Sequence, residues 1–124
     1  MSSPKYLGQK TTSPITELDT FPAPEGIGTV SMTSDEVTSV CPITGQPDWY
    51  TVTIEYEPKD LCIESKSLKL YLWHFRDKPG FCESMAVEIR RQVETDINPV
   101  YVTVSVVQKP RGGITIEATS STGD

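Results

Sequence analysis

The clearest pattern in the chain is an alternation of hydrophobic and polar residues from Trp49 to Glu57. Apolar residues occupy the even positions from 50 to 56, and threonine or glutamate occupies the odd positions from 51 to 57. A two-residue period is typical of a strand with one buried face. After a break at residues 58–60, the short apolar run Leu61 to Ile63 is predicted to be the partner strand of a hairpin.

Helical spacing follows at residues 64–77, where Leu68, Tyr71, Leu72 and Phe75 are three or four positions apart. The helix is expected to be capped by a serine at 65 or 67 and to end near residues 78–80. A second helix is predicted over residues 84–96, with an apolar stripe every four residues from Met85, and Asn-Pro at 98–99 stops it.

Alternation returns at residues 100–108, and a PRGG turn at 110–113 leads into a last strand at 114–119. The resulting order, β-β-α-α-β-β, predicts an α+β fold. Its four-stranded antiparallel sheet carries two antiparallel helices on one face. Such a sheet has two exposed edges, so we expect edge strands to join across subunits in a ring.

The length of 124 residues allows one domain. The proline- and glycine-rich residues 1–30 are expected to form a partly flexible arm on the surface or on a neighbouring subunit. Residues 31–119 are expected to form the catalytic domain, and residues 120–124 a tail.

The net charge of −6 gives no basic footprint for direct binding of nucleic acid. No apolar run approaches the roughly 20 residues of a membrane span. Three cysteines and no apparent signal peptide predict a cytoplasmic protein.

Candidate chemistry lies in the segment CPITGQPD at residues 41–48. It places a thiol, Cys41, and a carboxylate, Asp48, on a short loop stiffened by two prolines. A thiolate and a nearby proton donor suit nucleophilic attack on a small electrophile. From this stretch alone, a buried Cys and a turn-closing Asp are the more ordinary interpretation.

Four motifs occurring in this order resemble the nitrile reductases of queuosine biosynthesis (QueF), which convert 7-cyano-7-deazaguanine to its aminomethyl product. They are CPITGQPD, ESKSLKLYLW at 64–73, Phe81 to Glu83, and PRGG at 110–113. The resemblance covers roughly residues 20–119 and is strongest to the short, single-module type. It implies the tunnelling fold, in which subunits form a pentameric barrel and two barrels stack into a decamer with active sites at subunit boundaries.

The resemblance also implies roles for particular residues. Cys41 attacks the nitrile to give a covalent thioimide, Asp48 is the general acid, and NADPH supplies two hydrides. The residues implied for substrate binding are Ile63, Glu64, Ser65, Cys82 and Glu83. Those implied for NADPH binding are Lys66, Lys69, Arg111 and Gly112, with no metal site.

Judged without the resemblance, the two lysines are a solvated helix face, and Glu83 is an exposed residue favoured by the helix dipole. Cys82 stands where the family usually has His, which puts that residue's role in doubt. A reversible disulfide between Cys82 and Cys41 is a further hypothesis. No glycine-rich dinucleotide fingerprint is present, so a Rossmann-type cofactor site is not expected.

Three other functions compete with the reductase. One is an amidinotransferase that forms the same thioimide and uses ammonia on modified tRNA, although the ESKSLKLY motif and the acidic charge point away from it. A tunnelling-fold cyclohydrolase needs zinc ligands that one His and three scattered Cys supply poorly. A non-catalytic, ring-forming binder of a purine-like ligand would not need Cys41 and Asp48.

Overall fold

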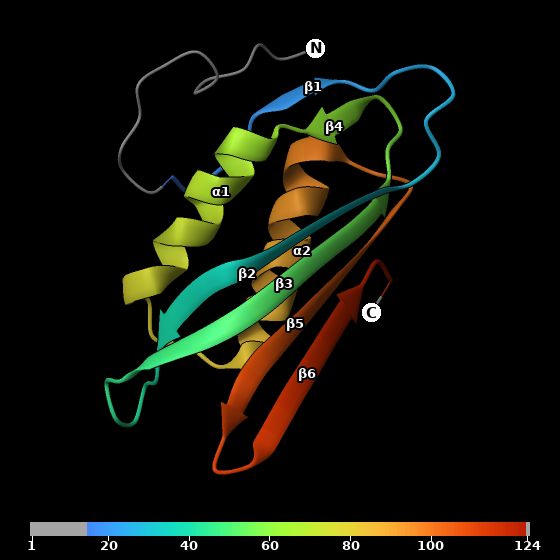
Figure 1. Ribbon diagram of the computed structural model, residues 1–124. Coiled ribbons are helices and arrows are strands. Elements are labelled where there is room, and N and C mark those ends of the chain that lie inside the picture. Colours follow the sequence, from blue (N-terminus) through green and yellow to red (C-terminus); the bar gives the residue numbers. More distant parts are fainter. Residues whose placement is uncertain (1–14, 124) are drawn as a thin grey trace.

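The computed structural model describes residues 15–123 and shows two helices packed on one face of a four-stranded antiparallel sheet (Figure 1). The strand order is β2-β3-β5-β6. The strands are β2 (Val30–Val40), β3 (Pro47–Glu57), β5 (Tyr101–Arg111) and β6 (Ile114–Ser121). The element order predicted for the sheet and helices is therefore confirmed, and it is the order of the tunnelling fold.

The core lies between the sheet and the helices. Val52 and Ile54 of β3 pair with Val106 and Val104 of β5, and all four side chains are at most 1% exposed. Because strand side chains alternate between faces, every second residue is buried under the helices from Asp48 to Tyr56 in β3 and from Val102 to Val106 in β5.

Helix α1 (Ser65–Trp73) continues into a 3₁₀ turn, η1 (His74–Asp77), and α2 spans Cys82–Ile97. The two helices run in opposite directions across the sheet (Figure 1). The predicted apolar stripes are buried in both helices. The cap of α1 is Glu64 and not a serine: its carboxylate accepts hydrogen bonds from the backbone N–H groups of Lys66 and Ser67 at 2.7 and 2.8 Å.

The predicted first hairpin is wrong. β3 pairs with β2, and Leu61–Ile63 (β4) instead pairs with β1 (Thr20–Pro22) in a separate two-stranded sheet. The register of β2 shifts between Ser34 and Val37, so Asp35 and Glu36 form a β-bulge. The shift moves the helix-facing side chains from even to odd positions, which hides the two-residue period in the sequence.

The described part of the N-terminal arm packs against the domain. Ile15 and Leu18 are buried, and the N–H of Ile15 donates to the carbonyl of Leu70 in α1. The remainder of the predicted arm, residues 1–14, lies outside the described residues. Among the helices described, none is long and apolar enough to span a membrane.

Candidate active site

Cys41 and Asp48 lie at the closed end of the β2–β3 hairpin. The N–H of Cys41 donates to the carbonyl of Gln46 at 2.8 Å, and the N–H of Gly45 donates to the carbonyl of Cys41 at 2.9 Å. Gly45 has φ of 72°, a conformation that glycine adopts at little cost. The CPITGQPD segment is thus the connection of a hairpin, which fixes both functional residues to rigid strands.

The hairpin register sets the relative position of the thiol and the carboxylate. Ser39 pairs with Asp48, and Cys41 lies opposite Gln46. Continued alternation places Cys41 on the same face as Ser39 and Asp48. Cys41 and Asp48 are therefore diagonal neighbours, whose Cα atoms are expected to lie roughly 7–8 Å apart. Asp48 is 5% exposed and Cys41 is partly exposed. A reachable thiol beside a largely desolvated carboxyl group suits nucleophilic attack followed by protonation.

The segment before α2 is joined to the end of β2. Val40 forms an isolated bridge with Pro79, and the N–H of Gly80 donates to the carbonyl of Val40 at 3.3 Å. This contact brings the start of α2, where Glu83 is exposed in the first turn, to the same end of the sheet as Cys41. The β5–β6 turn, with Arg111 and Gly112, also lies at this end (Figure 1).

Cys82 belongs to the core. Its side chain is 1% exposed, and its Sγ donates to the carbonyl of Val106 at 3.1 Å. Burial, followed by the charge of Glu83, raises the pKa of the Cys82 thiol. A neutral, buried thiol is a poor substitute for a proton-relaying His. None of the three cysteines in the described chain forms a disulfide.

Ile63, Glu64 and Ser65 lie at the opposite end of the sheet from Cys41. They follow the far end of β3, and an 11-residue strand spans roughly 33 Å at about 3.3 Å per residue. The hydroxyl of Tyr56 accepts a hydrogen bond from the N–H of Ile63, and the carbonyl of Asp19 accepts one from Glu64. One chain therefore does not bring this predicted substrate segment to Cys41 and Asp48.

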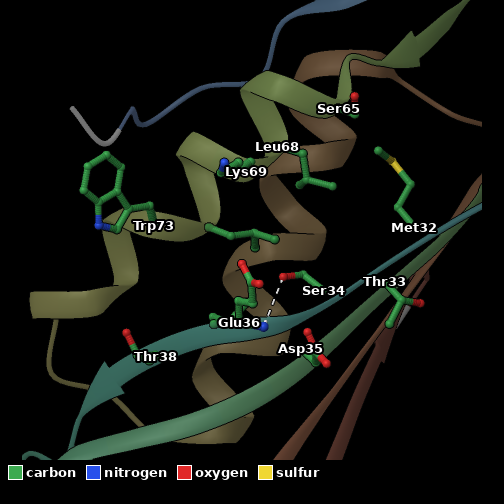
Figure 2. Close-up of a pocket in the computed structure, with 12 residues that line it drawn as sticks. Met32, Thr33, Ser34, Asp35, Glu36, Thr38, Ser65, Leu68, Lys69 and Trp73 are labelled. Atoms are coloured by element: carbon green, nitrogen blue, oxygen red, sulfur yellow. Dashed lines mark hydrogen bonds between the residues drawn. The ribbon is translucent and has the colours of Figure 1, made fainter. Parts of the chain in front are cut away.

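A groove of about 880 Å³ runs between α1 and the edge strand β2 (Figure 2). Its apolar walls include Met32, Leu68 and Trp73. Lys69 lines the groove and is exposed, and Glu36 lines it from the bulge. Lys66 is half-buried one turn earlier in α1 and does not line the groove.

Large exposed apolar side chains surround the Cys41 end of the sheet, a feature that the sequence analysis did not identify. Ile43 is 83% exposed in the hairpin connection, Phe81 is 55% exposed before α2, and Ile114 is 66% exposed after the β5–β6 turn. Apolar groups gathered at one end of a domain are typical of a surface that another molecule covers. Over residues 15–123, no group of three or more potential metal ligands comes together.

Comparison with known proteins assigns the chain to a family. The family described as QueF-like protein matches residues 47–124. An NADPH-dependent 7-cyano-7-deazaguanine reductase of Rhodopseudomonas palustris is 42% identical over 94% of this chain and 78% of its own length. The chain belongs to the QueF-like family.

Two further matches place the chain among other QueF-like proteins. The NADPH-dependent 7-cyano-7-deazaguanine reductase of Nitratidesulfovibrio vulgaris is 41% identical over 88% of this chain and 70% of its own length. A solved apo structure of an archaeosine synthase, QueF-Like, superposes with a TM-score of 0.75 at 26% identity. The superposition covers 81% of this chain and 98% of the chain in that structure. The fold is thus shared by QueF-like proteins that carry two different activity names.

Proposed function

We propose that this protein is the cytoplasmic reductase that converts 7-cyano-7-deazaguanine to 7-aminomethyl-7-deazaguanine with two NADPH in queuosine biosynthesis. The observation that carries the proposal is that a partly exposed Cys41 and a buried Asp48 both lie at the closed end of the β2–β3 hairpin. The 42% identity to an NADPH-dependent 7-cyano-7-deazaguanine reductase supports a nitrile as the electrophile.

In the proposed mechanism, the Cys41 thiolate adds to the nitrile carbon and forms a C–S bond, and the C≡N triple bond becomes a C=N double bond. The nitrile nitrogen takes up a proton as negative charge develops on it, and Asp48 donates that proton, which gives a neutral thioimide. Bound NADPH would supply the two hydrides that complete the reduction. Between the two reductions the C–S bond breaks, and Cys41 leaves as the thiolate, which frees it for the next substrate.

Glu83 is proposed to hold the guanine-like edge of the substrate. A carboxylate accepts two parallel hydrogen bonds from a ring N–H and an exocyclic amino group, and Glu83 is exposed at the Cys41 end of the sheet. Cys82 contributes by its place at the start of α2, since its thiol is engaged in the core. Ile63, Glu64 and Ser65 are proposed to contact substrate from a neighbouring subunit.

The residues proposed for NADPH fit that cofactor in part. The groove beside α1 offers apolar walls for the rings, and Lys69 is placed to pair with a phosphate. Lys66 adds positive charge at the start of α1. Arg111 and Gly112 lie at the β5–β6 turn, whereas the groove with Lys69 follows the edge strand β2, so in the proposed assembly they join the lysines from a second chain.

In the proposed ring, a neighbouring subunit brings residues 63–65 to the Cys41 end of the sheet. The strand order leaves β2 and β6 as the two edges of the four-stranded sheet, and pairing these edges between copies closes a barrel. We propose a pentameric barrel and a decamer of two stacked pentamers. The exposed apolar groups at the Cys41 end are the surface that a second copy covers.

The proposal is tested by mixing the protein with NADPH and 7-cyano-7-deazaguanine and following the absorbance of reduced cofactor, beside a Cys41→Ala control. Oxidation of two NADPH per nitrile, absent in the control, supports the reductase and the covalent role of Cys41 together. An absence of substrate-dependent oxidation in the wild type refutes the reductase.

The second candidate function is the amidinotransferase, which the fold shared with the archaeosine synthase favours. It uses the same Cys41 thioimide and replaces reduction with attack by ammonia. A Cys41-dependent covalent adduct that forms without NADPH oxidation, and that ammonia releases, would select this function over the reductase.

A further inference from the structure

The end of β2 is tied to the segment before α2 at three successive positions. The Ser39 hydroxyl donates to the carbonyl of Lys78 at 2.7 Å. Val40 forms a bridge with Pro79, and its carbonyl accepts from the N–H of Gly80 at 3.3 Å. These contacts lie immediately before Cys41 on one side and shortly before Glu83 on the other. They connect the proposed nucleophile to the proposed substrate-binding carboxylate within one chain.

Ser39 is the side chain at the centre of this contact. It is 1% exposed and pairs in register with Asp48, so one residue adjoins the proposed acid, the strand that leads to Cys41, and the backbone of Lys78. A small cavity of about 60 Å³ lies beside it, lined also by Phe75, Pro79 and Phe81. Burying a serine hydroxyl costs free energy unless the hydroxyl is hydrogen-bonded. Here the Ser39 hydroxyl donates to the carbonyl of Lys78.

We infer that Ser39 is a positioning residue that sets the distance between the Cys41–Asp48 hairpin and the Glu83 segment, an inference that rests on the proposed function. Ser39 does not contact substrate. It holds residues 78–80 against β2, so a base gripped by Glu83 presents its nitrile at the height of the Cys41 thiol. Reactions between positioned groups are sensitive to displacements of about 1 Å, which cost on the order of a hundredfold in rate.

The test measures Cys41 adduct formation by stopped flow in the absence of NADPH, with the rate at saturating substrate separated from the half-saturating concentration. Ser39→Ala is expected to lower the saturated rate by about tenfold or more. Ser39→Thr keeps the hydroxyl and has the small cavity for its methyl group, so it is expected to restore the rate to within about threefold of the wild type.

Ser120→Ala is the matched control. It removes a hydroxyl of similar burial that accepts a hydrogen bond from Arg90 at 2.7 Å, on the other edge strand. Its saturated rate is expected to stay within about twofold of the wild type, although its stability falls. An equal loss in Ser39→Ala and Ser120→Ala, or no loss in Ser39→Ala, would overturn the inference.

A backbone pair keeps the inference testable if Ser39→Ala does not fold. Gly80→Pro removes the N–H that donates to Val40, and Gly80→Ala keeps it, with the new Cβ at an ordinary 3.5 Å from Ser84 Oγ. Only the proline variant is expected to form the Cys41 adduct more slowly.

If the wild type forms no adduct, the proposed function fails. Hydrogen exchange of the backbone amides of residues 80–83 then tests whether Ser39 holds this segment against β2. Faster exchange in Ser39→Ala than in Ser120→Ala supports that role, and equal exchange in the two variants refutes it.

Discussion

At the scale of single residues, the structure separates the three cysteines into one accessible thiol and two core side chains. Cys41 is partly exposed at the hairpin end, whereas Cys62 and Cys82 are 3% and 1% exposed. Burial raises the pKa of Cys82, so its thiolate fraction at neutral pH is reduced as well as its accessibility. Only Cys41 has the exposure that a nucleophile needs.

A thiol-specific alkylating reagent is therefore expected to modify Cys41 first, with Cys62 and Cys82 reacting at least about tenfold more slowly in the folded protein. Peptide mass spectrometry at successive times measures the three rates, and the unfolded protein in denaturant serves as the control in which they converge. Modification of Cys82 at the rate of Cys41 would show that its thiol is open to solvent.

Two buried tyrosines differ in what their hydroxyls contact. The Tyr56 hydroxyl accepts the N–H of Ile63, and burial raises its pKa to about 12. The Tyr71 hydroxyl has no hydrogen-bond partner in the described structure, and burial, with Glu88 and Asp96 nearby, raises its pKa above the usual range. Tyr56→Phe is thus expected to lower the free energy of unfolding by about 1–3 kcal/mol at pH 7, because it leaves a buried N–H unpaired. Tyr71→Phe is expected to lower it little or not at all.

The same raised pKa values predict weakening at alkaline pH. Both tyrosines titrate near 10 when unfolded and higher when folded, so the stability they give is complete below pH 10 and falls as the pH rises toward 12. Each contributes a slope of up to about 1.4 kcal/mol per pH unit in that range. Urea unfolding from pH 7 to pH 11 measures it, and a slope that Tyr71→Phe leaves unchanged would contradict the assignment.

At the scale of elements, the start of α1 depends on an unusual cap. Glu64 uses both carboxylate oxygens to accept the first N–H groups of the helix, and the hydroxyl of Ser67 donates back to the carbonyl of Glu64 at 2.8 Å. The N–H of Asp19 donates to that same hydroxyl, so the arm is tied to the ESKS segment. Glu64 and Ser67 of this motif therefore have a structural role at the start of α1, in addition to any contact with a ligand.

Glu64→Ala is expected to lower the free energy of unfolding by about 1–2 kcal/mol, because two helix N–H groups lose their acceptor. Urea denaturation measures the change. Glu83→Ala, an exposed carboxylate in the first turn of α2, is the matched control and is expected to change stability by less than about 0.5 kcal/mol. An unchanged urea midpoint for Glu64→Ala would show that the carboxylate does not stabilise the helix, which leaves substrate contact as its only proposed role.

The elements also show which patterns can be predicted from sequence. The alternation of β3 and β5 and the stripes of both helices predicted the core, because burial on one face imposes a regular period. β2 was not predicted, since its bulge interrupts the period and serines occupy two of its helix-facing positions, 34 and 39. The partner of β4 was misassigned because short loops favour hairpins, whereas β4 pairs with a strand far earlier in the chain.

At the scale of the whole molecule, one chain carries Cys41 and the predicted substrate segment, residues 63–65, at opposite ends of an 11-residue strand. The motifs revealed which residues matter. Their separation appeared only in the fold, because it depends on β4 lying beyond the far end of β3 from the Cys41 hairpin (Figure 1). The proposed ring, joined through β2 and β6, accounts for both observations if it brings the Cys41 end of one subunit to the start of α1 in another.

Mixing two inactive variants tests this arrangement. Cys41→Ala lacks the nucleophile and Lys69→Ala lacks the groove lysine, so a site built from two chains is intact wherever each chain supplies its unaltered half. With equal, random mixing in a cyclic oligomer, about one site in four recovers NADPH oxidation. Cys41→Ala mixed with Asp48→Asn is the control: both residues lie on one hairpin, so no mixed site has both. Recovery in the first mixture and none in the second requires a shared site. No recovery in either, with oligomers formed, would place the whole site within one chain.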